Sequence, residues 1–477
     1  MFFRLLYDEQ LAQASYLIGC AATGEALVVD PNRDLDQYFD LAEREGLRIT
    51  AVTETHIHAD FVSGARELAA RSGARLYLSA AGTPDWQYAY AGAAGATLLR
   101  DGDTFMVGNI RIDVLHTPGH TPEHLSFLVT DTAHADEPMG ILTGDFVFVG
   151  DVGRPDLLER AAGYAGTMEA GARQLYASLQ RFMALPDHLQ VWPGHGAGSA
   201  CGKALGAVPQ STIGYEKRFN WALRVADEET FVKCVLEGQP NPPRYFAQMK
   251  RTNKEGPALL STLLPPRYLR PADLPAKLTV GCLVVDTRSG DAYAGGHVPG
   301  TFNLPLGEGF VSWAGWLLPY DRPFALIVED PGAAAAAVRE LRLIGLDDVA
   351  GYWTAGALAV WAAEGHEPAT IRRVDPAGLP RLLEQGAVVI DVRERAERTL
   401  GHIPGSRAIP LGYLAHRLDE VPRHRPVVVY CQGGMRSSIA ASLLASAGYA
   451  HVVDLVGGFD AWQRHERAAP VAAPALA

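Results

Sequence analysis

An internal repeat constrains the fold more than any other feature of this sequence. An aspartate, a histidine, two prolines and a glycine recur in the same order at a constant offset of 391 − 286 = 105 residues. The matched pairs are Asp286 and Asp391, His297 and His402, Pro299 and Pro404, Gly300 and Gly405, and Pro305 and Pro410. This agreement predicts two copies of one domain of about a hundred residues.

Each copy alternates two kinds of segment. A β-type apolar run leads into a Gly/Pro turn, and a second apolar run leads into an Ala-rich helix. Strands that alternate with helices are typical of α/β domains with a parallel sheet. Pro-rich stretches at 263–275 and 366–376 indicate linkers. We therefore expect the two copies at 270–367 and 372–477.

The first 262 residues lack the repeat and form a third predicted domain. Apolar β-type runs are spread through it: YLIGC, ALVVD, ITAVTET, RLYLSA, IRIDVLHT, LSFLVT and MGILTGD. Helices are expected at 33–46 and 61–72, and a polar, mostly helical stretch at 211–257. The pattern predicts a mixed α/β layer domain over 1–262. Three domains fit 477 residues at about 150 residues per domain.

Composition excludes several classes of protein. Lys and Arg total 42 and Asp and Glu total 54, and the net charge of −12 argues against a surface that binds nucleic acid. No stretch reaches about 18 uninterrupted apolar residues, so no membrane span is expected. The five cysteines form no CxxC pair, which favours a reducing, cytoplasmic setting over a disulfide scaffold. We expect a homo-oligomer, although no sequence feature fixes its size.

Polar side chains follow several apolar runs of the first domain. The run ITAVTE leads directly into His56, His58 and Asp60, which share one face of an extended segment. Other donors follow further apolar runs: His120, Asp145 and His195. Donors that converge from several strand ends on one edge of a sheet can hold a metal ion. Isolated surface histidines in Gly-rich loops are the alternative, which the ordered set disfavours.

This ordered set resembles the metallo-β-lactamase superfamily over about residues 1–260. The resemblance implies an αββα sandwich. Dinuclear hydrolases of that superfamily carry H-x-H-x-D-H, but the last position here is Phe61, which offers no lone pair. We therefore expect a mononuclear site formed by His56, His120 and Asp145. Two histidines and one carboxylate are typical of non-haem Fe(II) oxygenases.

Within the superfamily the chain is similar to the persulfide dioxygenases, which oxidise the sulfane sulfur of a low-molecular-weight persulfide to sulfite. The resemblance implies one Fe(II) per chain, held by His56, His120 and Asp145. It makes His58, Asp60 and His195 groups that orient the ligands or water. Better-known members of that family keep a histidine at the position of Phe61, so their mononuclear iron does not depend on this change. The substitution therefore weakens the dinuclear alternative without identifying the metal.

Two further residues of the first domain have open interpretations. Arg154 matches an arginine near the site of the same family and is predicted to bind a substrate carboxylate or the nascent sulfite. The alternative is a loop ion pair with Asp151 or Asp156. Cys201 lies on a Gly-rich loop six residues after His195, where it could receive persulfide sulfur, and Lys203 could favour its thiolate. The alternative is a buried, inert thiol.

Cys431 follows the run PVVVY and precedes a helical segment. The residues Gln432, Gly433, Gly434 and Met435 separate it from Arg436. Backbone N–H groups of such a loop and of the helix N-terminus can surround a group on the sulfur. The pattern resembles the rhodanese sulfurtransferases over about 372–466, which implies a Cys431 nucleophile with Arg436 and a loop that binds the sulfur. Asp391 is interpreted as structural, and Cys20, Cys234 and Cys282 as core residues.

The first copy of the repeat departs from this pattern. When LIVED is aligned with VVVYC, Asp330 takes the place of Cys431 and the following loop is two residues shorter. The segment PGAAAAA contains neither thiol nor arginine. We expect this copy to be a degenerate rhodanese-like scaffold or docking module. The predicted fold is therefore an αββα sandwich followed by two rhodanese-like α/β domains.

The two resemblances together imply a bifunctional, sulfide-detoxifying enzyme. The metal site would oxidise a thiol persulfide with O₂ to sulfite, and Cys431 would transfer sulfane sulfur to form or use thiosulfate. A zinc-dependent thioester hydrolase resembling glyoxalase II is the alternative for the first domain. A third possibility is a docking protein whose first domain is catalytically silent. The thiol carrier and the direction of sulfur transfer stay open.

Overall fold

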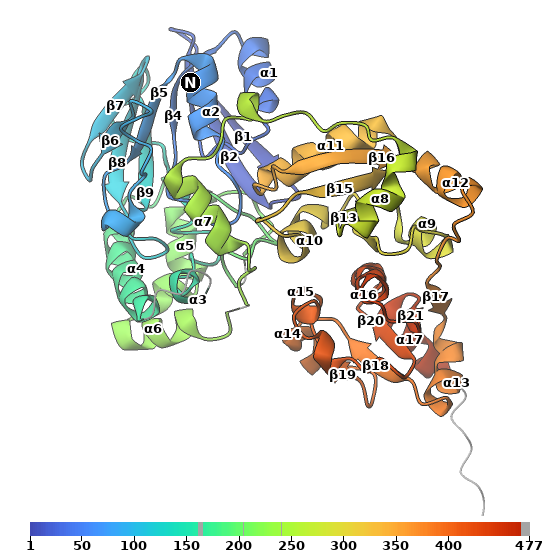
Figure 1. The fold of residues 1–477 in the computed structure, drawn as a ribbon. Helices are drawn as coiled ribbons and strands as arrows, with labels where there is room; N and C mark the ends of the chain where they lie inside the picture. Colours follow the sequence, from blue (N-terminus) through green and yellow to red (C-terminus); the bar gives the residue numbers. More distant parts are fainter. Residues whose placement is uncertain (161–165, 204, 240, 469–477) are drawn as a thin grey trace, which may run out of the picture. The chain divides into compact units, whose positions relative to one another are not determined.

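The structure, a computed structural model, describes residues 1–160, 166–203, 205–239 and 241–468. These residues pack into two compact units, and Figure 1 labels many of their helices and strands. Unit 1 comprises Met1–Leu264 and Arg339–Leu346, and unit 2 comprises Pro265–Val338 and the chain from Asp347 onward. The segment 339–346 falls within the predicted middle domain, yet it packs with unit 1, where the carbonyl of Leu343 accepts a hydrogen bond from the Val62 N–H.

Unit 1 contains two six-stranded sheets. The first has the order β1-β2-β3-β4-β5-β6, antiparallel up to β3 and parallel from β3 to β6. Its strands are β1 (Phe2–Asp8), β2 (Gln13–Cys20), β3 (Glu25–Val29), β4 (Arg48–Thr53), β5 (Arg75–Ser79) and β6 (Thr97–Leu99). The second has the order β12-β11-β10-β9-β8-β7, antiparallel except between β10 and β11. Its strands are β7 (Thr104–Val107), β8 (Ile110–His116), β9 (Leu125–Asp131), β10 (Gly140–Gly144), β11 (Gln190–Pro193) and β12 (Ser211–Thr212).

The two sheets face each other across one apolar core. Alternate side chains of a strand point to opposite faces of its sheet, so Leu27 and Val29 of β3 pack against residues of the second sheet such as Phe127. Ala26 and Val28 point the other way and pack against helices. The buried runs on both faces explain why these strands read as continuous apolar segments in the sequence.

Helices cover the outer face of each sheet in unit 1. Those on the first sheet are α1 (Asp36–Arg44) and α2 (Ala65–Ser72), close to the two expected helices. Those on the second sheet include α4 (Thr167–Met183) and α6 (Glu228–Leu236). The remaining helices of unit 1 before residue 264 are α3 (Leu157–Arg160), α5 (Ile213–Phe219) and α7 (Phe246–Glu255), with 3₁₀ turns at Pro84–Trp86, Ala222–Arg224 and Leu260–Thr262. The result is the predicted αββα sandwich; strand β1 and helix α4 were not expected.

Unit 2 contains two parallel sheets. The middle sheet has the order β14-β13-β15-β16 and the C-terminal sheet the order β17-β21-β20-β18-β19. Strands of the middle sheet are β13 (Leu283–Asp286), β14 (Phe302–Asn303), β15 (Phe324–Val328) and β16 (Val349–Thr354). Strands of the C-terminal sheet are β17 (Arg372–Val374), β18 (Val388–Asp391), β19 (Arg407–Ala408), β20 (Val427–Tyr430) and β21 (Val452–Leu455). The predicted parallel sheets are therefore present.

Helices alternate with these strands, as the sequence predicted. Along the middle part they are α8 (Leu274–Thr279), α9 (Gly290–Gly295), α10 (Phe310–Leu317), α11 (Pro331–Leu343) and α12 (Gly356–Ala363). Along the C-terminal part they are α13 (Leu379–Glu384), α14 (Arg395–Thr399), α15 (Leu411–Leu414), α16 (Met435–Ser446) and α17 (Gly458–Ala468). Within the described ranges, no helix combines the length and apolarity needed to cross a membrane.

Strand register corrects one detail of the sequence alignment. In the middle sheet Asp286 pairs with Ile327, and in the C-terminal sheet the corresponding Asp391 pairs with Tyr430. The residue that corresponds to Cys431 is therefore Val328, and the placement of Asp330 there was wrong by two positions. With this register the distance to the glycine after the helix is equal in both copies, 345 − 328 = 17 and 448 − 431 = 17 residues. The middle sheet therefore has Val328 at the position that Cys431 takes in the C-terminal sheet, and the chain that follows is equally long in both.

Candidate functional site

The predicted metal donors of unit 1 all lie where strands end. His56, His58 and Asp60 follow β4, and His120 lies in the connection between β8 and β9. Asp145 comes directly after β10, and His195 lies two residues after β11. All six side chains are buried. The sandwich thus brings together residues that are up to 139 positions apart, since 195 − 56 = 139.

One donor group consists of His56, His120 and Asp145, the three predicted ligands. Their candidate ligand atoms all lie within 4.8 Å of one another. The distance from Asp145 Oδ2 to His120 Nε2 is 3.4 Å, and the distance to His56 Nε2 is 3.9 Å. Two imidazoles and one carboxylate therefore face a common point.

A second donor group consists of Asp60, His195 and Cys201, again within 4.8 Å of one another. His195 Nε2 lies 3.2 Å from Asp60 Oδ2 and 3.4 Å from Asp145 Oδ1. Asp145 therefore presents one oxygen to each group. The sequence analysis gave Asp60 and His195 as orienting groups and Cys201 as a candidate sulfur acceptor near His195, and the structure places the three side chains together. Phe61 is fully buried and packs against the His58 ring.

The hydrogen bonds around these donors fit a bound cation. His120 Nδ1 donates to the carbonyl of Arg154 at 3.0 Å and His195 Nδ1 donates to the carbonyl of Ala12 at 2.9 Å. Because a carbonyl can only accept, both imidazoles carry a proton on Nδ1, so Nε2 is the nitrogen left for a metal ion. No hydrogen bond from the described residues reaches either oxygen of Asp60 or Asp145. Buried, unbonded carboxylates beside free imidazole lone pairs form a cation-binding set.

His56 is oriented through a relay that the sequence analysis missed. Thr55 Oγ1 donates to Asp30 Oδ2 at 2.8 Å and lies 2.9 Å from His56 Nδ1, from which it accepts. The Asp30 Oδ1 atom also accepts from the Thr55 N–H at 2.6 Å. This arrangement leaves Nε2 of His56 free as a ligand. Asp30 ends the run ALVVD, so a carboxylate at the end of a strand was the available signal.

His58 is not part of either donor group. Its Nε2 lies 3.1 Å from Asp30 Oδ1. Burial alone would lower the pKa of His58, but the charge of Asp30 and its hydrogen bond raise it to about 9. His58 is therefore an imidazolium that anchors Asp30, in agreement with an orienting role.

The pKa values of two other histidines, His56 and His120, shift downward instead. Burial, reinforced by the neighbouring histidines, holds the pKa of His56 well below its ordinary value, and burial lowers the pKa of His120 as well. Both rings are therefore neutral at pH 7, the form that ligates a metal. His124, another residue not predicted, accepts the Asp145 N–H at 3.1 Å and fixes the start of the Asp145 loop.

Arg154 forms the ion pair that the sequence analysis gave as its alternative role. Its Nε and one terminal nitrogen donate to the two Asp156 oxygens at 2.7 Å each, and the side chain is fully buried. The other terminal nitrogen donates to the carbonyl of Ala200. The geometry favours a structural role in which the Arg154 carbonyl orients His120, and substrate contact stays a prediction.

Cys201 is buried beside acidic groups. Burial first, and then the charges of Asp145 and Asp60, raise the pKa of its thiol well above the ordinary value. Lys203 points elsewhere: its ammonium donates to the carbonyl of Cys234 at 2.6 Å and lies over the Trp221 ring. The expectation that Lys203 stabilises a Cys201 thiolate is therefore wrong.

Cys431 lies at the carboxyl end of β20 in unit 2 and is buried. The N–H of Gly434 donates to its sulfur at 3.1 Å. Gly434 has φ of +116°, in a region of backbone conformation that glycine adopts most readily. A Cβ at Gly458 would lie 2.4 Å from the carbonyl of Cys431, so glycine is required for this close approach.

The predicted loop residues differ in their environments. Gln432 accepts from Arg393 at 2.7 Å and donates to Asp460, so its side chain holds the loop rather than facing a substrate. A Cβ at Gly433 would meet nothing within 4 Å, and the Met435 side chain is exposed. Arg436 donates through both terminal nitrogens to the Glu397 carboxylate at 2.7 Å each, a contact that the sequence analysis did not predict.

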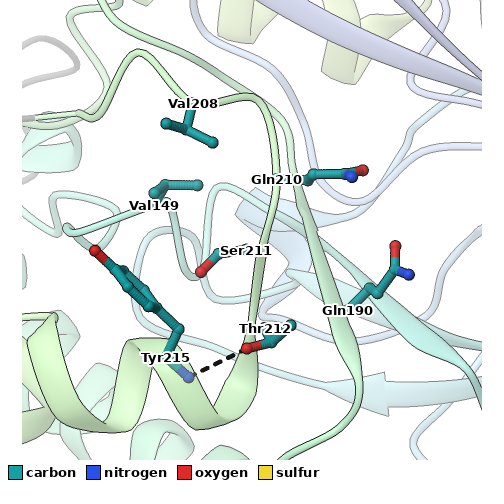
Figure 2. Close-up of a pocket in the computed structure, with 7 residues that line it drawn as sticks. All are labelled: Val149, Gln190, Val208, Gln210, Ser211, Thr212 and Tyr215. Atoms are coloured by element: carbon teal, nitrogen blue, oxygen red, sulfur yellow. Dashed lines mark hydrogen bonds between the residues drawn. The ribbon is translucent and has the colours of Figure 1, made fainter.

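A pocket of about 490 Å³ lies elsewhere in unit 1. Its lining residues are shown in Figure 2: Val149, Gln190, Val208, Gln210, Ser211, Thr212 and Tyr215. The lining contains none of the predicted site residues and no cluster of ionisable groups among the residues drawn. We therefore do not assign it to the candidate site.

Family models match two parts of the chain. Residues 9–195 match the Metallo-beta-lactamase superfamily, and residues 375–465 match the Rhodanese-like domain. A solved structure of "Metallo-beta-lactamase from Staphylococcus aureus subsp. aureus COL" is 47% identical with a TM-score of 0.68, and the match covers 74% of this chain and 99% of that chain.

Curated relatives match separate parts. A "Sulfurtransferase" of Allochromatium vinosum is 35% identical over 22% of this chain and 97% of its own length. A "Hydroxyacylglutathione hydrolase" of Nitrosococcus oceani is 32% identical over 48% of this chain and 88% of its own length. A "Beta-lactamase hydrolase-like protein" of Agrobacterium fabrum is 28% identical over 48% of this chain, and the chain spans about half of that relative, 54%. The two-sheet sandwich and the cysteine loop agree with these matches. Together they show that the chain belongs to the metallo-beta-lactamase superfamily and carries a C-terminal rhodanese-like domain.

Proposed function

We propose that the protein is a bifunctional sulfur-oxidising enzyme. Its first activity is Fe(II)-dependent oxidation of a low-molecular-weight thiol persulfide by O₂ to sulfite, and its second is sulfur transfer through Cys431. The observation that carries the proposal is the donor group of His56, His120 and Asp145, two neutral imidazoles and one unbonded carboxylate on one face. The cysteine loop at Cys431 supports a sulfur substrate for the chain.

The first reaction balances as RSSH + O₂ + H₂O → RSH + SO₃²⁻ + 2 H⁺. Bound Fe(II) would supply open coordination positions for the persulfide and O₂, and the four electrons that reduce O₂ come from the sulfane sulfur. The chain's own residues prepare the site: Asp30 and Thr55 fix the His56 ring, and the Arg154 carbonyl fixes the His120 ring. Buried surroundings exclude bulk water from the donors. One iron per chain is the proposed content.

The second reaction uses Cys431 as the nucleophile. Its thiolate attacks the outer sulfur of RSSH, releases RSH and forms a Cys431 persulfide. Sulfite then takes the outer sulfur: Cys–S–SH + SO₃²⁻ → Cys–SH + S₂O₃²⁻. The Gly434 N–H and the N-terminus of α16 stabilise negative charge on the sulfur throughout.

The middle part is proposed to be a degenerate rhodanese-like domain at 270–367, between domains at 1–262 and 372–477. Its strand order β14-β13-β15-β16 repeats the order β19-β18-β20-β21 of the C-terminal sheet. Val328 replaces the nucleophile, so we propose a scaffold or docking role. The five cysteines are all free, which supports a reducing, cytoplasmic setting. A homo-oligomer stays a prediction.

Metal analysis and oxygen uptake test the proposal together. The protein is purified without oxygen, its metals are quantified, and O₂ consumption is followed after addition of glutathione persulfide. We expect about one iron per chain and O₂ uptake that depends on the persulfide. Two zinc ions per chain, no uptake and hydrolysis of a glutathione thioester would instead support the hydrolase alternative.

That hydrolase alternative has two observations in its favour. The relative from Nitrosococcus oceani bears the name of a hydroxyacylglutathione hydrolase. In its favour as well, the second donor group of Asp60, His195 and Cys201 provides a place for a second cation. The sulfur-transfer domain in the same chain favours the oxygenase, because sulfite is the acceptor that this domain needs.

A further inference from the structure

The C-terminal domain contains two acid–arginine pairs near Cys431. Asp391 pairs with Arg393, whose Nε donates to Asp391 Oδ1 at 3.0 Å. Glu397 pairs with Arg436, which donates to both carboxylate oxygens at 2.7 Å. Both pairs have the geometry of fork-like, two-point contacts. These contacts alone do not show which pair stabilises the fold and which pair contributes to the chemistry of Cys431.

The internal repeat makes this separation for the first pair. In the middle domain Arg288 Nε donates to Asp286 Oδ1 at 3.0 Å, the same distance as between Arg393 and Asp391. Each arginine also donates to a glycine carbonyl eight residues later, Gly296 at 3.0 Å and Gly401 at 2.7 Å. A copy without a catalytic thiol keeps this pair intact. The Asp391–Arg393 pair is therefore part of the common framework.

The second pair is lost together with the thiol. The offset of 105 places Ala292 at the position of Glu397. The strand register, with 431 − 328 = 103, places Val328 at Cys431 and Ala333 at Arg436. Nucleophile, arginine and glutamate are all absent from a copy that keeps the fold. Glu397 and Arg436 thus belong to the chemistry of Cys431.

Glu397 is fixed in place at the start of α14. It lies at the third helical position and accepts the backbone N–H of Glu394 at 3.0 Å, which completes a capping box. The hydrogen bonds with Arg436 lower the pKa of Glu397 against the effect of its burial, so the carboxylate stays ionised at neutral pH. Arg436 is the second residue of α16, directly after the cysteine loop. An anion that enters the loop meets a guanidinium whose charge is already neutralised.

We propose that Glu397 is a positioning residue that holds Arg436 beside Cys431 and cancels its charge, so that the loop does not retain dianionic sulfite or thiosulfate. This inference rests on the proposed function in one respect, the identity of those dianions. Under that function the thiosulfate formed leaves readily, and the enzyme resists inhibition by its own product. The site is thereby adapted to producing thiosulfate rather than to consuming it.

Alkylation of Cys431 by two reagents of different charge tests the charge effect directly. Rates for anionic iodoacetate and neutral iodoacetamide are measured on the full chain, with Cys431 followed by peptide mass spectrometry. We expect Glu397→Gln to raise the iodoacetate rate relative to the iodoacetamide rate about fivefold, because one opposing charge is removed at a partly exposed site. Glutamine preserves the capping box, so the helix start is retained.

Two control variants identify the cause. Glu384→Gln removes an exposed carboxylate that precedes the amino end of β18. Cys431 follows the carboxyl end of β20, so this variant should leave the ratio unchanged. The double variant Glu397→Gln/Arg436→Gln removes both charges of the pair and should return the ratio close to the wild-type value, because the intact pair carries no net charge. Equal changes with both reagents, or a ratio in the double variant that stays as high as in Glu397→Gln alone, would refute the inference.

Steady-state kinetics provide a second readout. In sulfur transfer from thiosulfate to cyanide, Glu397→Gln should lower the KM for thiosulfate about fivefold while kcat changes less. A purely structural role would lower kcat and leave KM for the dianion high. The ratio of the two alkylation rates can be measured even in an enzyme that transfers no sulfur. An unchanged ratio in an active enzyme therefore rejects only this inference, whereas a changed ratio in an inactive enzyme rejects only the proposed function.

Discussion

At the scale of single residues, the candidate metal site depends on groups that are not themselves ligands. Asp30 receives hydrogen bonds from the Thr55 N–H and Oγ1 and contacts His58. Its φ of +51° lies in the left-handed region, where Asp and Asn are among the few residues that fit. Asp30 thus combines a backbone turn with the orientation of His56.

Replacement of this carboxylate should weaken metal binding. Asp30→Asn keeps the turn but gives Thr55 and His58 a neutral partner, so we expect metal affinity to fall about 10- to 100-fold. Competition with a chelator, followed by metal analysis, measures the change. Asp136→Asn alters an exposed carboxylate of unit 1 and is the matched control. Equal metal retention in both variants would show that the relay has no role in binding.

At the scale of elements, the donors are fixed by ties between loops. Glu123, just before β9, accepts the Ile57 N–H at 2.8 Å and so holds the segment that carries His56 and His58. Asn253 of α7 donates to the carbonyls of His58 and Phe61 at 2.8 and 2.7 Å. Both ties join segments that are distant in sequence. They hold the segment after β4, which carries the first donors, against the β8–β9 connection and helix α7.

The tie at Glu123 should make stability depend on pH. Burial raises the pKa of Glu123 to about 7 from the model-peptide value of 4.5. The folded protein therefore binds more protons than the unfolded chain between these values, and stability falls as pH rises from about 4.5 to about 7. The loss amounts to about 3 kcal/mol at 1.36 kcal/mol per pH unit.

Urea unfolding of the metal-free protein at several pH values measures this effect. Glu123→Gln keeps an acceptor for the Ile57 N–H but cannot ionise. We expect it to match the wild type near pH 4.5 and to be more stable above pH 7. Glu43→Gln, at an exposed position of α1, should follow the wild type throughout. Parallel curves for wild type and Glu123→Gln would contradict the assignment.

At the scale of the whole molecule, two chemical sites lie in different units. The metal donors belong to unit 1 and Cys431 to unit 2. Each site has its own scaffold, a two-sheet sandwich in one case and a parallel sheet in the other. Because each scaffold has its own core, loss of one site should leave the other intact.

Two variants test this independence under the proposed function. Cys431→Ser should abolish thiosulfate formation while sulfite accumulates. His120→Ala should remove iron and O₂ uptake but leave sulfur transfer from thiosulfate to cyanide unchanged. Product analysis and oxygen uptake on both variants are the measurements. Loss of both activities in either variant would indicate that the two units must work together.

The sequence by itself determined the number and kind of the layers. Apolar runs of five to eight letters between turn residues marked most strands, and the 105-residue repeat revealed the two parallel sheets of unit 2. It also gave His56, His120 and Asp145 as ligand candidates, because each follows an apolar run and the ordered set resembles that of a known superfamily. Local periodicity carries this information without any knowledge of long-range contacts.

The tertiary structure decided the rest, because those features depend on contacts between distant segments. Periodicity could not show that Asp30 orients His56, that Cys201 joins Asp60 and His195, or that Glu397 holds Arg436. Nor could it fix strand register, since a short apolar run can be shifted by two residues and still present the same face. Hydrogen bonding between neighbouring strands removed that ambiguity and placed Val328, not Asp330, at the position of the nucleophile.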